Sequence, residues 1–425
     1  MVNGESMKMN KIEKLIAVLC PEGVEWKAIG DFGELVRGNG MPKSDFVESG
    51  VGCIHYGQIY TYYNIWTTET ISFIPTSKAE KLAKVEPGDL VITNTSENIE
   101  DVCKAVAWIG KDQIVTGGHA TVLKHDQDPK YLSYYLKTPY FSEDKKKYAT
   151  GTKVIDVSAK SLAKIRIPIP PLAIQQEIVK ILDTFTTLEA ELEAELEARK
   201  KQYEYYRDEL LTFGEDVDWK TLGDVCEMKA GKSISASDIS SLRSEDNLYS
   251  CIGGNGSRGY VNSFSHNGKF PIIGRQGALC GNVCFAEGKF YATEHAVVVK
   301  CGEDFIARFL YHLLLVLNLN QYATGGAQPG LAVSNLAKIK IPIPPLAEQE
   351  RIVAILDKFD ALVNGTTPSP DGATPPKEGN NPALTGTHPQ EGNLSASLPA
   401  ELHARRKQYE YYRGKLLTFK EKYES

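Results

Sequence analysis

The sequence has 425 residues, of which 42% are hydrophobic and 24% are charged, and its formal net charge is −6. This length allows two to four domains, and the composition is that of a soluble globular protein that can bury a hydrophobic core. The negative charge excludes a protein that binds nucleic acid by overall charge alone, so any such binding must use local positive faces.

The N-terminal segment is short, and residues 1–8 are typical of an optional leader because Met9 could equally begin the chain. The apolar run at 15–20 is too short to span a membrane. Glu13 lies just before this run, which is unlike a secretory signal peptide. We therefore expect a cytoplasmic protein that makes no membrane contact.

The eight cysteines show no C-x-x-C spacing. Buried, reduced thiols are therefore expected. A zinc site that includes Cys280 and Cys284 is the alternative, although no pair of histidines lies near them in the sequence. We predict no metal site.

Much of the chain is repeated, and the repeats define its organisation. A stretch that begins with Tyr148-Ala-Thr-Gly and runs through Ile-Pro-Ile-Pro-Pro-Leu returns 174 residues later, from Tyr322. Arg199–Arg207 likewise returns, nearly unchanged, as Arg405–Arg413. Between these blocks lie two longer segments that resemble each other only weakly, which suggests one task performed on two targets. The predicted domains are an N-terminal segment (1–23), a first module (24–150), a central region with a long helix (151–215), a second module (216–325) and a C-terminal region with a second long helix (326–425).

Each module combines strand-like runs, separated by glycines and polar turns, with a helical stretch near its end. This pattern predicts an α+β domain that is rich in antiparallel strands. The expected helices lie near 131–137 and 305–319, and the expected strands cover 53–60, 89–93, 102–109, 270–274, 281–286 and 295–299.

The repeated regions after the modules are expected to form long helices. Pro171 suits the first turn of a helix, and from there to Phe213 apolar residues recur in steps of three and four. At about 1.5 Å per residue this helix would be roughly 60 Å long. A helix this amphipathic needs a partner, and its own repeat is the obvious candidate. We therefore expect two long antiparallel helices in a coiled coil, with the second interrupted at about 365–397 by a Pro-, Gly- and Thr-rich insertion that is typical of disorder.

Known catalytic and nucleotide-binding motifs do not fit the sequence. Gly231-Lys232-Ser233 resembles the end of a P-loop, but Cys226 stands where that loop requires a glycine. Zinc-protease, serine-hydrolase and dinucleotide-binding patterns do not occur either. The sequence therefore favours a binding protein with no catalytic residues of its own.

Both modules instead contain polar turns that are suited to the edges of DNA bases. Asn and Gln can pair with adenine and Arg with guanine, while lysines and backbone turns can contact phosphates. His119 and His295 fall at matched positions, where a packed structural histidine is favoured over a DNA contact. The candidate DNA-binding residues are Lys43, Tyr56, Gln58, Tyr60, Asn94, Thr95, Ser96, Asn98, His119 and Lys153 in and after the first module, and Lys232, Asn255, Gly256, Arg258, Tyr260, Arg275, Gln276, His295 and Gln328 in and after the second.

The repeated regions carry a family resemblance. Pro-Ile-Pro-Pro-Leu-Ala, a following Gln-x-x-Ile-Val, and then Lys-Gln-Tyr-Glu-Tyr-Tyr-Arg and Leu-Leu-Thr-Phe closely resemble the specificity subunit of type I restriction-modification systems. In the second module, the sequences at 272–277 and 288–295 resemble the target-recognition domains of that family. The first module and the insertion depart from it, because Asn94 to Asn98 stand where the second module has Gly274 to Gly277.

The resemblance implies two pseudo-symmetric α/β target-recognition domains, separated by the long helices. It implies a non-catalytic subunit that reads a bipartite, asymmetric site in double-stranded DNA, one half-site per domain, with the helices setting the spacer. Two methyltransferase subunits, which use S-adenosylmethionine to methylate adenine at N6, and two restriction subunits, which use ATP and Mg, would dock on the chain, which itself would bind no cofactor. The alternatives are a coiled-coil adaptor that binds proteins without reading DNA, and an enzyme that works alone.

Overall fold

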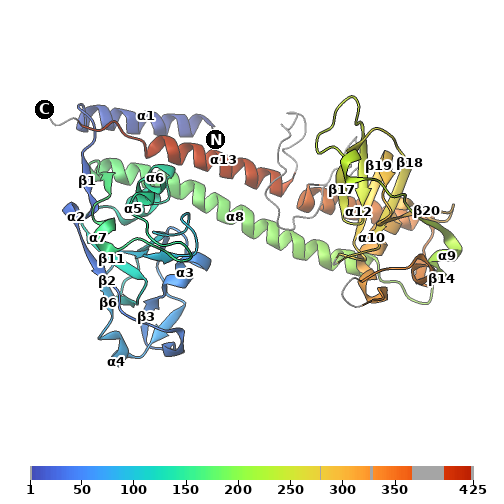
Figure 1. Cartoon of the computed structure of the whole chain (residues 1–425), viewed down its shortest axis with the longest axis horizontal. Helices are drawn as coiled ribbons and strands as arrows, with labels where there is room; N and C mark the ends of the chain where they lie inside the picture. The colour runs from blue at the N-terminus through green and yellow to red at the C-terminus, as the bar shows by residue number, and fades with distance from the viewer. Residues whose placement is uncertain (1, 278, 326–328, 366–396, 423–425) are drawn as a thin grey trace. The chain divides into compact units, whose positions relative to one another are not determined.

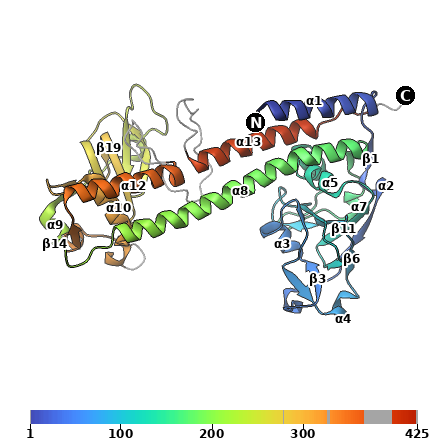
Figure 2. The same cartoon turned by 180° about the vertical axis from the view of Figure 1, so that it is seen from behind.

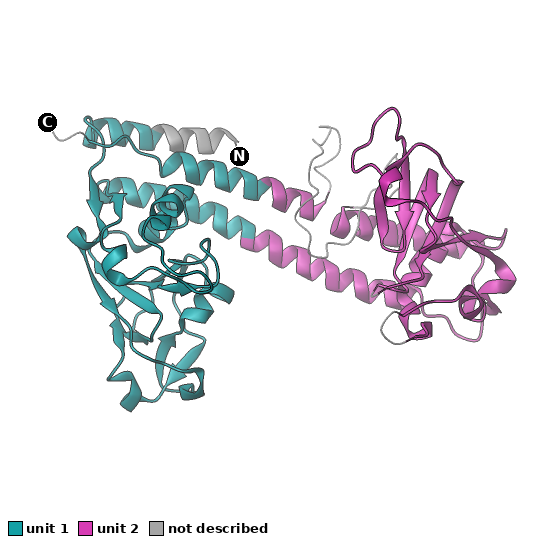
Figure 3. Ribbon diagram, viewed as in Figure 1, with its two compact units in different colours: residues 1–189, 405–425 teal, residues 190–404 magenta. Residues whose placement is uncertain are grey.

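The computed structural model describes residues 2–277, 279–325, 329–365 and 397–422. The chain forms two compact units, which are described one at a time: unit 1 contains residues 1–189 and 405–425, and unit 2 contains residues 190–404 (Figure 3). The long helix α8 (Leu172–Leu210) contributes to both units, as does the helix α13 (Leu398–Leu416). Each unit therefore includes helical segments from both repeated regions.

Unit 1 contains two mixed sheets. In order across the sheet, the larger one consists of β2 (Gly33–Arg37), β11 (Ala120–His125), β7 (Leu90–Thr93), β9 (Ala105–Trp108) and β4 (Trp66–Thr67), and the smaller one of β5 (Ser72–Ile74), β3 (Val51–Ile54), β10 (Ile114–Thr116) and β6 (Ala83–Val85). β11 is antiparallel to both of its neighbours. β7 and β9 are buried along their whole length, as expected for strands that are covered on both faces.

Short helices and two small ladders complete unit 1. The ladders pair β1 (Trp26–Ala28) with β13 (Arg166–Pro168), and β8 (Thr95–Ser96) with β12 (Ile155–Asp156). The helices are α1 (Val2–Leu19), α2 (Ile29–Phe32), η1 (Lys43–Asp45), α3 (Tyr56–Thr61), α4 (Thr76–Ala79), α5 (Pro129–Tyr135), α6 (Pro139–Lys146) and α7 (Ala159–Leu162). Within the unit, α5 lies close to α8, and α4 lies at the end farthest from it (Figure 1).

One predicted strand of unit 1 is wrong. The run 53–60 continues as a strand only to Ile54, and α3 begins at Tyr56. The reason is a local capping arrangement around His55. The Nδ1 atom of His55 accepts a hydrogen bond from Gly57 N at 3.1 Å, and Gln58 Oε1 accepts one from His55 N at 2.9 Å. These bonds satisfy amides at the start of the helix, which outweighs the strand preference of the apolar residues.

Unit 2 contains one six-stranded sheet. Its order is β15 (Cys226–Ala230), β20 (Ala296–Cys301), β18 (His266–Gly274), β19 (Val283–Ala292), β16 (Tyr249–Gly253) and β17 (Gly256–Val261). The helix α10 (Ala307–Val316) packs on this sheet, and Phe309, Leu310 and Leu313 lie in the shared core (Figure 2). The helix predicted near 305–319 is thus confirmed. The remaining elements are β14 (Asp218–Thr221), which pairs with β21 (Lys340–Ile343), and α9 (Leu222–Val225), η2 (Ala236–Asp238), η3 (Leu319–Tyr322), α11 (Val333–Leu336) and α12 (Leu346–Asn364).

The repeated sequences form matching hydrogen bonds in the two units. Gln175 is buried in unit 1, where its Nε2 atom donates to Pro170 O at 2.7 Å and its Oε1 atom accepts from Asp128 N at 3.0 Å. In unit 2, 174 residues later, Gln349 donates to Pro344 O at 2.9 Å and accepts from Ile306 N at 2.9 Å. Each buried amide thus fixes the turn at the repeated prolines to the start of a helix that packs on the module.

A repeated carboxylate joins the same elements. Asp183 on α8 accepts from Tyr134 Oη at 2.8 Å and forms an ion pair with Lys130 at 2.6 Å, both on α5. Asp357 on α12 pairs in the same way with His312 and Arg308 on α10, each at 2.7 Å. The partners differ chemically, but the positions agree. The architecture shared by the two units therefore includes the junction between the module and the long helix.

The long helices pair as expected within unit 1. Phe185 on α8 stacks on Tyr412 of α13 with ring centroids 5.3 Å apart, and Glu189 forms an ion pair with Arg406 at 2.7 Å. The contact residue on α13 moves back towards its N-terminus as the one on α8 advances, so the two helices are antiparallel here. In unit 2, Tyr206 of α8 stacks on Phe359 of α12 at 5.7 Å.

The mixed helix and sheet architecture confirms the predicted fold class, and α8 follows the first module and precedes the second along the chain. The predicted insertion at about 365–397 falls almost entirely outside the described residues. α12 ends at Asn364 before it, and α13 begins at Leu398 after it.

Candidate nucleic-acid interface

Asn94 has a structural role in unit 1 in place of the predicted base contact. Its side chain is 1% exposed. Its Nδ2 atom donates to Val157 O at 2.8 Å, and its Oδ1 atom accepts from Thr121 Oγ1 at 2.8 Å. Because burial and internal bonds occupy both ends of the amide, Asn94 cannot read a base without breaking the module.

Gln58 and Tyr60 are also engaged internally. Gln58 holds the start of α3 through its Oε1 atom, and its Nε2 atom donates to Ser72 Oγ at 2.6 Å. The Tyr60 hydroxyl donates to Thr95 O at 2.5 Å, and burial raises the pKa of Tyr60 to about 12. These contacts position α3 and β8, so the structure does not favour either side chain as a primary base contact.

Tyr56 and His119 form an aromatic pair in unit 1. Their ring centroids are 5.0 Å apart, and His119 is exposed. His119 has a φ of 66°, a left-handed conformation that is uncommon outside glycine. Its Nδ1 atom lies 3.0 Å from Thr95 Oγ1. The structure thus places His119 in an exposed turn, whereas the sequence favoured a packed histidine at this position.

The other candidates of unit 1 lie at its surface. Lys43, Asn98 and Lys153 are exposed, and Ser96 is half-buried. Asn98 is held in its loop, because its side chain exchanges two hydrogen bonds of 2.8 Å with Asp101. Among the described residues, no hydrogen bond, ion pair or ring contact joins Lys43, Asn98 or Lys153 to Tyr56 or His119, so each remains a separate candidate.

Unit 2 contains a compact polar cluster, which we name the 275/295 cluster. It consists of Arg275, Thr293, Glu294 and His295, from the turn after β18 and the turn before β20. Arg275 N donates to His295 O at 3.0 Å, which joins the two turns. His295 Nε2 lies 3.3 Å from Glu294 Oε1. Two of these residues, Arg275 and His295, were predicted from the sequence.

Each residue of the 275/295 cluster has one buried side-chain atom without a hydrogen-bond partner among the described residues. These atoms are Arg275 Nε, Thr293 Oγ1, Glu294 Oε2 and His295 Nδ1. Leaving a buried donor or acceptor unpaired costs about 1–3 kcal/mol. Such a concentration of unpaired groups in two adjoining turns is expected where a polar ligand completes the hydrogen bonds.

A glycine turn brings a third segment up to this cluster. A Cβ atom on Gly254 would lie 2.7 Å from His295 O and 3.1 Å from the Cα atom of Gly274, so only glycine allows this approach. Asn255 follows and is exposed, and its Oδ1 atom accepts from Asn282 Nδ2 at 3.2 Å. The Gly-Gly-Asn-Gly turn is therefore part of the same surface as the 275/295 cluster.

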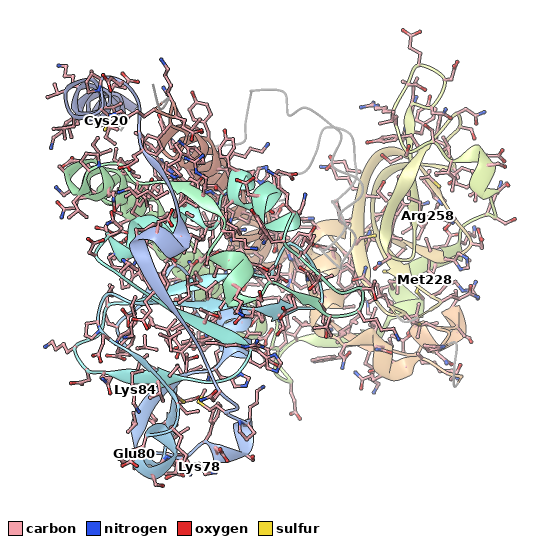
Figure 4. The ribbon with its side chains drawn as sticks, turned by 60° about the vertical axis from the view of Figure 1, so that its left-hand side comes forward. Cys20, Lys78, Glu80, Lys84, Met228 and Arg258 are labelled. Atoms are coloured by element: carbon pink, nitrogen blue, oxygen red, sulfur yellow. The ribbon has the colours of Figure 1, made fainter. Side chains whose placement is uncertain are left out.

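The remaining candidates of unit 2 surround this turn. Gly256 has a φ of 97° and begins β17, on which Arg258 is exposed and Tyr260 half-buried (Figure 4). Gln276 is exposed and pairs with Gly330 through the backbone. Lys232 is exposed beside Thr293, to which it is joined by a backbone bridge. Gln328 lies outside the described residues.

Sequence comparison identifies the two modules. A family model described as the type I restriction modification DNA specificity domain matches residues 21–198 and again residues 214–368. The chain belongs to the type I restriction-modification specificity subunits. It is 43% identical over 316 residues to the EcoprrI specificity subunit of Escherichia coli, and this alignment covers 68% of this chain and 76% of that protein. It is 34% identical over 345 residues to the EcoR124I/EcoR124II specificity subunit of Escherichia coli, covering 68% and 70%.

Solved structures agree in fold. The specificity subunit from M. genitalium covers 93% of this chain and 96% of its own length, with a TM-score of 0.58 at 14% identity. A chain from a study of assembly and conformational transition of the type I restriction-modification system has a TM-score of 0.52, also at 14% identity. The resemblance inferred from the repeated sequences is therefore confirmed.

Two side chains of this specificity subunit's 275/295 cluster were missed by the sequence reasoning, Thr293 and Glu294. The available signal was their position directly before His295, which is matched in the first module by Gly117 and Gly118 before His119. In the described residues no group of three or more His, Cys, Asp or Glu side chains could hold a metal ion. No helix in the same residues has the length and hydropathy of a membrane span.

Proposed function

We propose that this specificity subunit binds a bipartite, asymmetric site in double-stranded DNA, with one half-site read by each unit. The observation that carries the proposal is the 275/295 cluster, whose unpaired donors and acceptors suit base edges and phosphates. Both units repeat the same proline turn and helix start, including the buried bonds of Gln175 and Gln349, whereas the modules differ in their exposed turns. This combination supports two related domains that read two different DNA sequences. The long helices would set the spacing of the half-sites.

The same repetition supports two copies of one docking partner. Unit 1 exposes Leu172 (46%) and Tyr411 (63%), and unit 2 exposes the repeated residues Leu346 (48%) and Tyr205 (65%). Exposed large apolar side chains at matched positions are typical of protein interfaces. We propose that each unit docks one methyltransferase subunit, which uses S-adenosylmethionine to methylate adenine at N6.

Two restriction subunits, which use ATP and Mg, would complete the complex, and this chain would supply neither catalysis nor a cofactor site. We expect the complex to act in the cytoplasm, where its DNA is. A coiled-coil adaptor that reads no DNA is the competing function.

The decisive experiment is adenine methylation mapping in cells that carry this chain with its methyltransferase subunit. We expect methylation at one bipartite motif. Arg275→Ala should lower the discrimination between bases by about 1–3 kcal/mol, and only in the half of the motif that unit 2 reads. The control in the other module is His119→Ala, which should affect only the half of the motif read by unit 1. If either variant lost specificity at both halves of the motif, or if methylation followed no motif, the proposal that each unit reads one half-site would be wrong.

A further inference from the structure

Two cysteines of unit 2 face each other across neighbouring strands. Cys226 begins β15, Cys301 ends β20, and the two are directly opposite in the antiparallel ladder. Next to them, Gly302 N donates to Val225 O at 3.0 Å, so the cysteines occupy a non-hydrogen-bonded position of the ladder. Opposite Cα atoms at such positions are about 4.5 Å apart. This separation falls within the range of about 4.4–6.8 Å in which a disulfide can form.

The two thiols are also oriented towards each other and can be reached from outside. Directly opposite residues of an antiparallel ladder place their side chains on the same face of the sheet, so the two thiols lie beside each other. Cys226 is buried and Cys301 is half-buried, but both line a surface hollow of about 520 Å³, together with Asp224 and Lys300. A small oxidant can therefore approach the pair without unfolding the unit.

The interaction between the two thiols shifts their pKa values in opposite directions. Hydrogen bonding to Cys301 lowers the pKa of the Cys226 thiol, although burial opposes this effect. The same hydrogen bond and burial raise the pKa of Cys301. Because the thiolate is the reactive form, Cys226 is the residue expected to react first.

We propose that Cys226 and Cys301 are a reversible thiol–disulfide modification site, which reacts with hydrogen peroxide. The Cys226 sulfur attacks one peroxide oxygen, the O–O bond breaks, and Cys226 sulfenic acid and one water form. The Cys301 sulfur then displaces the sulfenic hydroxyl, which leaves as a second water with the Cys301 proton. Two thiols and one peroxide thus become one disulfide and two waters. This inference does not depend on the proposed DNA reading.

The site belongs to unit 2 alone. At the matched positions of unit 1, Gly33 lies opposite His125. A Cβ atom on Gly33 would lie 2.5 Å from Leu123 Cδ1, so a cysteine would not fit there without displacing the core. In unit 2, β15 is at the edge of the sheet with β20 as its neighbour. A disulfide would tie this edge strand, which leads to Lys232, to the interior of the sheet.

The test is peroxide titration of the folded full-length chain, followed by alkylation of remaining thiols and mass spectrometry. We expect the loss of two hydrogens, a peptide cross-link between Cys226 and Cys301, and its reversal by dithiothreitol. Hydrogen exchange of residues 226–230 should be slower in the oxidised chain.

Variants separate this pair from the other thiols. Cys226→Ser and Cys301→Ser should each abolish the cross-link, whereas Cys284→Ser, which replaces a buried cysteine opposite Ile272, should keep it. Free thiols at both positions after oxidation of the wild-type chain would overturn the proposal. Cross-links to other cysteines, or oxidation of Cys226 beyond the sulfenic acid without a cross-link, would overturn it as well.

Discussion

Asn94 carries an amide that can pair with adenine, and the sequence places it in a polar turn. In unit 1 that amide is buried and bridges Val157 and Thr121. The cost of exposing it to DNA would be the loss of both bonds. At the scale of single residues, burial therefore separates side chains that build the module from those that can meet a ligand.

We expect Asn94→Ala to lower the free energy of unfolding of unit 1 by about 1–3 kcal/mol, because it leaves Val157 O and Thr121 Oγ1 unpaired. Asn98→Ala is the control, since Asn98 is exposed and should change stability by no more than about 0.5 kcal/mol. Denaturant unfolding measures both. If Asn94→Ala kept full stability and lost only DNA binding, the structural role would be wrong.

We expect His312 to make the stability of unit 2 depend on pH. Burial lowers its pKa from the usual 6.5, and the charge of Arg308 lowers it further, although the hydrogen bond with Asp357 opposes both. Below pH 6.5 the unfolded chain binds a proton that the folded chain does not, so stability falls as the pH falls. The maximum slope for one such proton is about 1.4 kcal/mol per pH unit.

The repeat supplies a matched variant for this effect. Tyr134 occupies the position of His312 in unit 1 and donates to Asp183 at 2.8 Å. His312→Tyr should keep a bond to Asp357 and remove this proton's contribution to the loss of stability below pH 6.5. Unfolding at neutral and mildly acidic pH tests this. An unchanged pH slope in the variant would assign the dependence to other groups.

At the scale of elements, the long helices are held by aromatic residues and not by charge alone. Phe185 is buried against Tyr409 and Tyr412 of α13, whereas the ion pairs along the exposed face of α8 are expected to contribute little. The repeated tyrosines thus divide into those that contact Phe185 or Phe359 at the helix pairs, namely Tyr203, Tyr206, Tyr409 and Tyr412, and the exposed Tyr205 and Tyr411.

We therefore expect Phe185→Ala to destabilise unit 1 by about 3–5 kcal/mol, because it leaves a cavity between α8 and α13. Tyr411→Ala should leave the unfolding transition almost unchanged, since Tyr411 is exposed. Thermal unfolding followed by circular dichroism distinguishes the two. A large loss of stability in Tyr411→Ala would show that this side chain belongs to the fold and not to an interface.

At the scale of the whole molecule, the repeat predicts two equivalent docking events. Tyr411→Ala should remove the partner from unit 1 and Tyr205→Ala should remove it from unit 2. Native mass spectrometry of each complex should then detect one bound methyltransferase subunit in place of two, and none in the double variant. Binding of two subunits in every variant would exclude these tyrosines from the interface.

Much of the structure of the two repeated regions could be predicted, because their sequences occur twice in nearly identical form. The helix that follows Pro171 is indicated by apolar residues that recur in steps of three and four, and local spacing is enough to assign it. The α3 helix was mispredicted because the apolar pattern of 53–60 does not reveal that His55 and Gln58 cap a helix.

The sequence by itself determined that the chain is a duplicated frame with two diverged modules, since repetition and periodicity are properties of residue order. Only the tertiary structure decided which polar residues are free to bind. Asn94 is buried in the core, and Thr293 and Glu294 lie in a turn next to Arg275. Cys226 lies opposite Cys301 on the neighbouring strand. The reason is physical: burial and contacts between distant strands depend on the sheet register, which neither composition nor local spacing specifies.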